Sequence, residues 1–109
     1  MKILFDQGTP APLRRYLAEH EVDLAFERGW SKLSNGDLLF AAENEGYQLL
    51  ITTDQNLRYQ QNISGRRLAA LVLLSTSWPR IQLRVDAIPA AVETVGLGSY
   101  NLNFARNNN

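Results

Sequence analysis

The stretch LLITTD at residues 49–54 decides the fold, because an unbroken apolar run ends there in two threonines and an aspartate. A continuous run of this kind is typical of a strand buried on both faces, as in a parallel sheet. Two further runs have the same form: ILF at residues 3–5, which Asp6 follows, and LAALVLL at residues 68–74, which STS follows. The three runs predict three strands of a mostly parallel sheet.

The segment between the first two runs carries one strand pattern between two helix patterns. Thr9 and Pro10 predict the N-cap and first turn of a helix that ends near His20. Residues 22–26 alternate apolar and polar side chains, which is typical of a half-exposed strand near an edge of the sheet. Residues 34–46 predict a second helix, which a serine opens and a glycine ends.

The segment after the third run predicts one more helix and one more strand. Apolar side chains recur at three- and four-residue intervals over residues 78–92, and Pro89 inside this helix should kink or split it. Residues 100–104 alternate like a short edge strand. The repeated order of strand and helix predicts an α/β class. We expect a single domain over residues 1–104 and a frayed tail at 105–109.

Composition restricts the chemistry that this chain can perform. It has no cysteine, which excludes disulfides, thiolate metal sites and cysteine nucleophiles, and one histidine, which excludes a multi-histidine metal site within one chain. Eleven acidic and eleven basic residues cancel, so no global field attracts nucleic acid or membrane. No segment approaches the roughly 20 apolar residues that span a bilayer, and Asp6 stands where a signal peptide would continue its apolar run. We therefore expect a cytoplasmic protein, without a membrane partner, whose chemistry depends on carboxylates.

Two aspartates follow buried runs: Asp6 follows the first and Asp54 the second. In open parallel sheets ligands bind beyond the carboxyl ends of the strands, and the ends of neighbouring strands lie about 5 Å apart. Two carboxylates at that distance repel each other, and a divalent cation would remove the repulsion. Their joint occurrence favours a metal site at this edge.

Each of these residues also has a purely structural interpretation. Asp6 is suited to starting a turn, and Asp54 to capping the short segment at Gln55. Asp37 lies three residues after Ser34, as in a capping box, but the start of this helix also belongs to the ligand-binding end of the sheet. From the residues alone, the two interpretations of Asp37 remain equally open.

Basic and aromatic residues are the other candidates for binding. Nine of the eleven basic residues are arginines, whose guanidinium suits bidentate contact with phosphate. We select Arg14 and Arg58 as candidates for positioning a phosphate backbone. Trp30, between two basic residues, is suited either to stacking on a nucleobase or to packing over the sheet.

Several stretches together resemble the PIN-domain superfamily, above all the small bacterial PIN-like proteins related to VapC-type toxins. They are MKILFDQGTP (1–10), LSNGDLLFAAENEGYQLLITTDQNL (33–57), ALVLL (70–74) and WPRI (78–81). The resemblance covers nearly the whole chain in order. It implies a three-layer α/β/α sandwich with a mostly parallel central sheet, and a Mg²⁺ or Mn²⁺ site that hydrolyses phosphodiester bonds, typically of RNA.

The resemblance also implies which residues form that site. Asp6, Asp37 and Asp54 match the acidic residues that hold the metal and carry catalysis in that family. Asn56 stands where relatives commonly carry a second acidic residue after the last aspartate; its amide oxygen can still coordinate but brings no charge. Thr53 and Asn56 would orient carboxylate and water from a second layer of contacts.

Two functions follow from this resemblance. The first is a metal-dependent ribonuclease that forms the toxin-like component of a toxin–antitoxin pair, with RNA as substrate, a cognate antitoxin as partner and residues 100–104 as a possible homodimer edge. The alternative is a catalytically weak or inactive PIN-like binding protein, which Asn56 and the balanced charge favour.

Overall fold

The computed structural model describes residues 1–57, 66–95 and 98–102, the last range as backbone only. Its centre is a five-stranded sheet in the order β2-β1-β3-β4-β5, and every neighbouring pair is parallel. The strands are β1 (Lys2–Phe5), β2 (Glu21–Leu24), β3 (Leu49–Thr52), β4 (Ala69–Leu73) and β5 (Gly98–Leu102). The predicted α/β class with a parallel sheet is confirmed, and the three apolar runs form the three inner strands.

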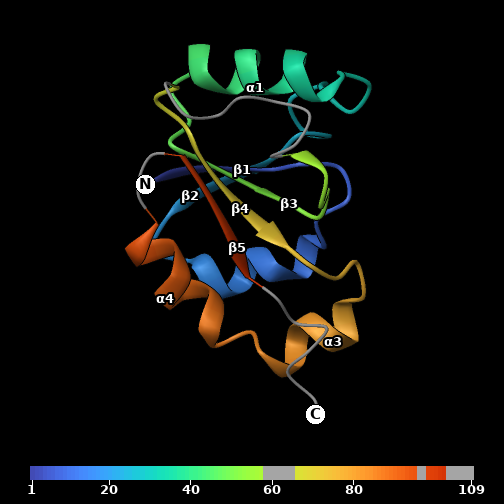
Figure 1. The fold of residues 1–109 in the computed structure, drawn as a ribbon, viewed down its shortest axis with the longest axis vertical. Helices are drawn as coiled ribbons and strands as arrows, with labels where there is room; N and C mark the ends of the chain where they lie inside the picture. The colour runs from blue at the N-terminus through green and yellow to red at the C-terminus, as the bar shows by residue number, and fades with distance from the viewer. Residues whose placement is uncertain (58–65, 96–97, 103–109) are drawn as a thin grey trace.

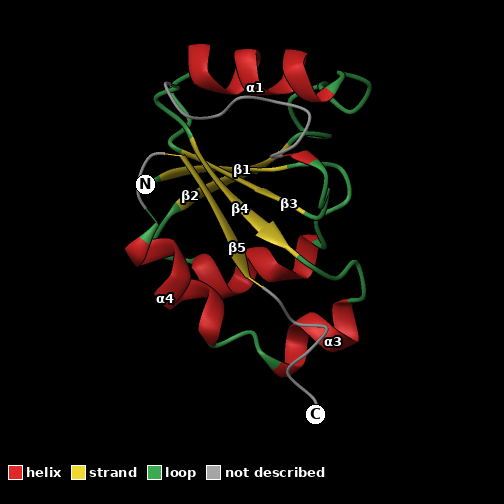
Figure 2. Cartoon of the chain, viewed as in Figure 1, coloured by secondary structure: helices red, strands yellow, loops and turns green. Residues whose placement is uncertain are grey.

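Helices lie on both sides of this sheet, as Figures 1 and 2 show. α1 (Asn35–Asn44) packs on one side. The other side carries the 3-10 helix η1 (Ala11–Leu17), α3 (Trp78–Leu83) and α4 (Ala87–Thr94).

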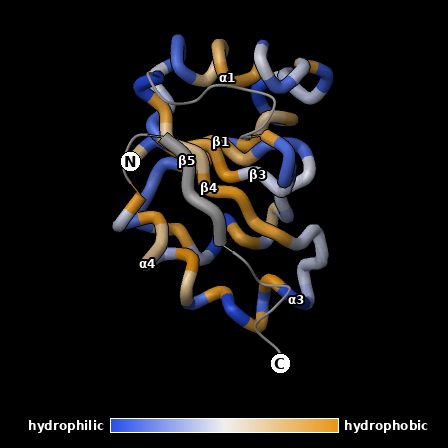
Figure 3. The backbone as a smooth tube through the Cα atoms, viewed as in Figure 1, coloured by the Kyte–Doolittle hydropathy of each residue, from blue (hydrophilic) through white to orange (hydrophobic). Residues whose placement is uncertain are grey.

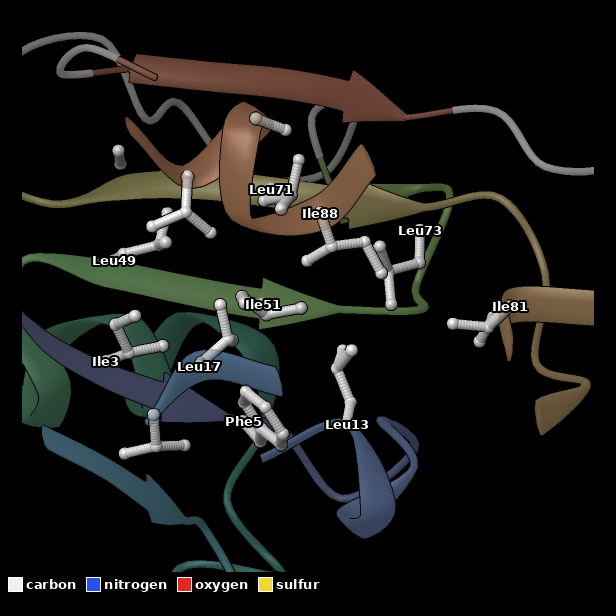
Figure 4. Close-up of a cluster of buried hydrophobic side chains, with 14 residues drawn as sticks. Ile3, Phe5, Leu13, Leu17, Leu49, Ile51, Leu71, Leu73, Ile81 and Ile88 are labelled. Atoms are coloured by element: carbon white, nitrogen blue, oxygen red, sulfur yellow. The ribbon is translucent and has the colours of Figure 1, made fainter. Parts of the chain in front are cut away.

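The inner strands supply side chains to the core on both faces, because alternate residues of a strand point in opposite directions. Ile3, Phe5 and Ile51 belong to the cluster under η1, α3 and α4, which Figure 4 shows in close-up. Leu4 and Leu50 belong to the cluster under α1. Figure 3 shows the resulting hydrophobic character along the inner strands. Burial on both faces explains why these strands are continuous apolar runs in the sequence.

The first helix differs from its prediction. Only Ala11–Leu17 is helical, in the tighter 3-10 form, and its N-cap is Pro10, with no side-chain cap. The hydroxyl of Thr9, predicted as the cap, is buried and lies 2.8 Å from the backbone carbonyl of Ile51. Thr9 therefore contacts the end of β3 and leaves the start of the helix without a side-chain acceptor.

The predicted long helix is split into α3 and α4, and the break precedes Pro89 by several residues. Pro89 is the third residue of α4, where a missing N–H disrupts no helical hydrogen bond. In an unbroken helix, Val85 would offer its carbonyl to Pro89, which has no N–H to donate. The Val85 carbonyl instead accepts from Ile88 over 3.2 Å. Pro89 thus sets the break one turn earlier.

Residues 22–26 and 100–104 were predicted as edge strands, and β2 and β5 do lie at the two edges. Residues 103 and 104, and the predicted tail at 105–109, lie outside the described residues. None of the helices in the described part of the chain is long and apolar enough to cross a membrane.

The outward-facing backbone groups of Leu24, the last residue of β2, are already bonded. Because the N–H of Ala25 donates to Phe5 of β1, the preceding residue, Leu24, faces outward. The N–H of Leu24 donates to Glu27 Oε1 over 3.0 Å, and its carbonyl accepts from the N–H of Arg28 over 3.2 Å. The last residue of this edge strand therefore offers no free backbone group to another strand.

Candidate functional site

Asp6 and Asp54 lie at the carboxyl ends of the neighbouring strands β1 and β3. From β1 the chain crosses to β2 on one side, and then returns to β3 on the other side. The order therefore reverses between β1 and β3, at the position where open α/β sheets bind ligands. The N–H of Asp6 still donates to the Ile51 carbonyl over 3.1 Å, so the strand pairing continues up to the aspartate.

The carboxyl group of Asp6 is held by two threonine hydroxyls. Thr52 donates a short hydrogen bond to Oδ2, and the hydroxyl oxygen of Thr9 lies 2.6 Å from Oδ1. Burial raises the pKa of Asp6 above its ordinary value, and the charge of Asp54 raises it further, whereas the bonds from Thr52 and Thr9 act in the opposite direction. The fold therefore makes ionisation of Asp6 less favourable than in an unfolded chain.

The Thr9 hydroxyl is shared between the Asp6 carboxyl group and the end of β3. The Thr9 hydroxyl lies within hydrogen-bond distance of both Asp6 Oδ1 and the Ile51 carbonyl, 2.6 and 2.8 Å away, yet it carries one proton. When Asp6 is protonated, it donates to Thr9, and Thr9 donates to Ile51. When Asp6 is ionised, the two acceptors compete for the same proton.

The carboxylate of Asp54 is fixed from two sides. The side chain of Asn35, at the start of α1, donates to Oδ2 over 2.5 Å, and the N–H of Asn56 donates to Oδ1 over 2.9 Å. The N–H of Asp54 itself donates to the Thr52 hydroxyl over 3.0 Å. Thr52 therefore joins the two aspartates: its hydroxyl donates to Asp6 and accepts from the backbone of Asp54.

Gly8 lets the loop after β1 pack closely against the end of β3. A Cβ atom at this position would lie 2.6 Å from the Thr53 hydroxyl oxygen and 4.0 Å from Asp6 Oδ1. The first distance is too short for any side chain unless Thr53 moves. The loop and the strand end therefore approach each other at a distance that requires glycine.

A pocket of about 190 Å³ opens beside Asp6, between the carboxyl ends of β1 and β2 and the start of α1. We call it the Asp6 pocket. Its apolar lining comes from four residues, Ala25, Trp30, Leu33 and Leu38. Its polar lining comes from Asp6, Gln7, Ser31 and Asn35, and Gly8 completes the wall. Asp6 thus belongs both to this pocket and to the carboxylate pair.

The predicted site residues are brought together only in part. Asp6 and Asp54 meet, as the strand ends require. Asp37 lies in the first turn of α1 with an exposed side chain, and its N–H donates to the Ser34 hydroxyl over 3.3 Å, as a helix cap predicts. Within residues 1–57, 66–95 and 98–102, no three acidic or histidine side chains are grouped so that they could hold a metal ion. The role of Asp37 as a third ligand remains a prediction.

The other predicted residues have contacts of their own where the structure describes them. Asn56 is exposed and contacts Asp54 through its backbone. The hydroxyl that orients Asp6 is that of Thr52, whereas Thr53, predicted for this role, lies against Gly8. Arg14 is paired with Glu27 over 2.7 Å. Arg58 lies outside the described residues.

Sequence reasoning missed three residues that hold the carboxylates, Thr9, Thr52 and Asn35. The role of Thr52 depends on the register of the sheet: Phe5 pairs with Ile51, so Asp6 is aligned with the next residue, Thr52, and their side chains point to the same face. The contacts of Thr9 and Asn35 depend on how the loop and α1 pack on the strand ends, and no sequence pattern indicated them.

Two carboxylates are a donor set that a single hard cation accepts. Mg²⁺ is commonly held by one or two carboxylates and completes its shell with water and substrate phosphate. The charge of Asp54 raises the pKa of Asp6, and a bound cation would reverse this unfavourable interaction. The donor set therefore suits one ion held by Asp6 and Asp54.

No protein-family model, curated protein or solved structure matches this chain. The PIN-like resemblance of its sequence therefore remains a prediction, and the function is argued from the site.

Proposed function

We propose that this protein is a PIN-like, divalent-metal-dependent ribonuclease that hydrolyses RNA phosphodiester bonds. One observation carries the proposal: two aspartates meet at the reversal point of a parallel sheet, and the single hydroxyl of Thr52 connects them. A purely structural pair would gain nothing from placing two acidic groups so close together. A cation bound by both carboxylates would offset the repulsion between them.

Asp6 and Asp54 would hold Mg²⁺ or Mn²⁺. When bound, the ion supplies Lewis-acid activation of water and neutralises negative charge on the phosphate. Asp6 must be ionised for this, so the Thr9 proton would then serve Asp6 in place of the Ile51 carbonyl. Thr52 and Asn35 keep the two carboxylates in fixed orientations, which reduces the reorganisation needed when the ion and the substrate arrive.

Binding of RNA by this chain must come from local contacts, because its net charge is zero. We propose that Arg14 and Arg58 supply part of them, and that Asp37, at the exposed start of α1, contributes from the rim of the site. Arg14 would have to leave its ion pair with Glu27, and an exposed pair of this kind is weak enough to exchange. Affinity from so few phosphate contacts is modest and decreases with salt.

The direct test is cleavage of single-stranded RNA in the presence of Mg²⁺ or Mn²⁺. We expect Asp6→Asn and Asp54→Asn each to lower the rate about 100-fold or more, because each removes one of two charged ligands. Asp86→Asn is the matched control, since Asp86 is an exposed aspartate between α3 and α4 whose side chain makes no capping bond. Equal residual cleavage by the wild type and by Asp6→Asn would overturn the proposal.

The alternative is a PIN-like protein that binds partners without catalysis. The exposed, uncharged Asn56 next to Asp54 favours it, because a site with fewer charges holds metal less tightly. Calorimetric titration with Mn²⁺ separates the two functions, since a site without appreciable affinity for Mn²⁺ or Mg²⁺ cannot run the chemistry above. The partners that we propose are RNA, a cognate antitoxin and a second copy of the chain, and the proposed location is the cytoplasm.

A further inference from the structure

The Asp6 pocket has properties that the proposed metal chemistry does not use. Among the described residues, Asp6 is the one ionisable side chain in its lining, and the other lining residues are apolar or carry neutral amide and hydroxyl groups. A negative charge at its margin disfavours a free phosphate or carboxylate inside. The lining instead suits an uncharged group that has an apolar face and a hydrogen-bonding rim.

The volume of the pocket restricts its occupant further. At about 190 Å³ it is smaller than the roughly 300–1,000 Å³ of sites that enclose drug-sized ligands. It therefore suits a single ring system, with the remainder of the ligand outside. A nucleobase is such a group, since each base has an apolar π-face and polar edges.

Trp30 is the aromatic residue of the lining, and its neighbours hold it in place. Its backbone N–H donates to the Ala25 carbonyl over 2.9 Å, the guanidinium of Arg28 lies 4.6 Å from its ring centre, and the Tyr47 ring meets it edge-on at 6.0 Å. Arg28 is fixed in turn by Glu45, 2.9 Å away. A ring held by several neighbours loses little freedom when a base stacks on it, so the wall is organised in advance.

We propose that the Asp6 pocket binds one nucleobase of the RNA strand, at the nucleotide next to the bond that is cut. The location follows from Asp6, which lines the pocket and also belongs to the carboxylate pair. A phosphate at the carboxylates would therefore place an adjoining base at the mouth of the pocket. Trp30 supplies the stacking surface, and Gln7 and Ser31 face the polar edge of the base. The proposal rests on the proposed function for its substrate but not for its binding chemistry.

The first test is binding of ribonucleoside 5′-monophosphates without metal, in EDTA. The chain has two tryptophans, so in a Trp78→Phe background the fluorescence reports Trp30 alone. We expect saturable quenching by at least one of the four nucleotides and no saturable change with ribose 5-phosphate, which lacks the base. Equal responses to the nucleotides and to ribose 5-phosphate would overturn the proposal.

The second test measures nucleotide affinity calorimetrically in variants of the pocket. Trp30→Ala should lower the affinity about 10-fold or more, and Trp30→Phe should keep most of it, because a phenyl ring still stacks. Gln7→Ala should lower the affinity less, and Gln82→Ala, exposed on α3, serves as its control. If Trp30→Ala does not fold, the comparison of Gln7→Ala with Gln82→Ala still decides the outcome: equal affinity in these two variants would contradict a base in this pocket.

Activity then separates this proposal from the proposed function. If Asp6→Asn binds nucleotides but does not cleave RNA, both are supported. If the wild type binds nucleotides and cleaves nothing, the pocket is supported and the ribonuclease is not. If the wild type cleaves RNA but Gln7→Ala leaves both its rate and its choice of cleavage site unchanged, the ribonuclease stands and the pocket proposal is overturned.

Discussion

The two ends of the sheet carry pockets of opposite character. The pocket at the amino ends of the strands, between η1 and α4, is the larger, at about 480 Å³. It contains His20 and Glu93, which lie 3.2 Å apart and attract each other when His20 is protonated. The pocket at the carboxyl ends is less than half that volume, yet it adjoins two aspartates that repel each other.

The comparison shows that the larger pocket is not the one whose ionisable groups suggest a chemical role. At the amino end, a histidine next to a carboxylate forms a contact that needs no ligand, although His20 Nδ1 finds no hydrogen-bond partner among the described residues. At the carboxyl end, two acidic groups are held together by hydroxyls and an amide, so their repulsion is built into the fold. The smaller pocket is therefore the better candidate for a functional site.

Asp6→Asn should have the largest effect, because it removes both a proposed metal ligand and a buried ionisable group. It should therefore lower the activity and raise the free energy of unfolding. The pKa of Asp6 is raised in the folded protein, so between its ordinary and its raised value the native state holds a proton that the unfolded chain has lost. The free energy of unfolding therefore falls as the pH rises through that interval. An asparagine imitates the protonated form, accepting from Thr52 and donating to Thr9.

Urea unfolding in EDTA at several pH values measures this effect. In the Asp6→Asn variant the free energy of unfolding should not fall as the pH rises through this interval. The variant should be more stable than the wild type at neutral pH and should not cleave RNA. Saturating Mn²⁺ should stabilise the wild type and leave the variant unchanged. Parallel stability curves for the two proteins across pH would contradict our account of Asp6.

Thr52→Val is expected to have the next largest effect. The substitution keeps the shape of the side chain but removes the donor to Asp6 and the acceptor for the N–H of Asp54, and it should lower the free energy of unfolding by about 2–3 kcal/mol. Thr53→Val is the matched control one residue away and should change it by less than about 0.5 kcal/mol. A result in which the two variants are equally destabilised would mean that the Thr52 hydroxyl does not link the aspartates.

Gly8→Ala should produce a smaller loss that a second substitution reverses. The new methyl group would meet the Thr53 hydroxyl, so we expect a cost of about 1–2 kcal/mol in the free energy of unfolding. In a Thr53→Ala background the obstacle is absent, and Gly8→Ala should be neutral or stabilising by up to about 1 kcal/mol, since alanine restricts the unfolded chain. A double-mutant cycle measures the coupling, and strict additivity would show that the close approach is not limiting.

Glu93→Gln, at the amino end, should have the smallest effect. The side chain of Glu93 is 63% exposed, so water screens its charge, and its loss should change the free energy of unfolding by less than about 1 kcal/mol. Chemical denaturation at pH 6 and pH 8 measures it. A loss larger than that of Thr52→Val would reverse the comparison, because the amino end would then hold the more important polar contact.

The fold and the pairing of the aspartates follow from local signals in the sequence. Runs such as residues 3–5 and 49–52 are continuous because both faces of an inner parallel strand are buried. Parallel strands bring their carboxyl ends to one edge, which places Asp6 beside Asp54. The structural interpretations of both residues also hold: Asp6 starts a turn that the N–H of Thr9 closes, and Asp54 caps the segment after it. A structural role of an aspartate in a turn or as a cap therefore does not exclude a role of the same residue in a binding site.

The remaining details depend on tertiary packing that the sequence does not display. Thr9 precedes Pro10 and was predicted as a helix cap. Its hydroxyl instead lies within hydrogen-bond distance of Asp6, 3 positions away along the chain, and of Ile51, 42 positions away. Asn35 contacts Asp54 only because α1 packs over the ends of the strands. The helix is split near Pro89 as expected, but the break lies one turn before the proline, where the Val85 carbonyl would have needed the N–H that Pro89 lacks.

The bonded groups of Leu24 at the outer side of β2 have a consequence for self-association. A sheet that offers two open edges can add copies at both and grow into a fibre. Here Glu27 and Arg28 already bond the outward-facing N–H and carbonyl of Leu24, so a strand from another copy could not continue its pairing past the end of β2. Blocking the end of an edge strand in this way shortens the stretch with which another copy could pair.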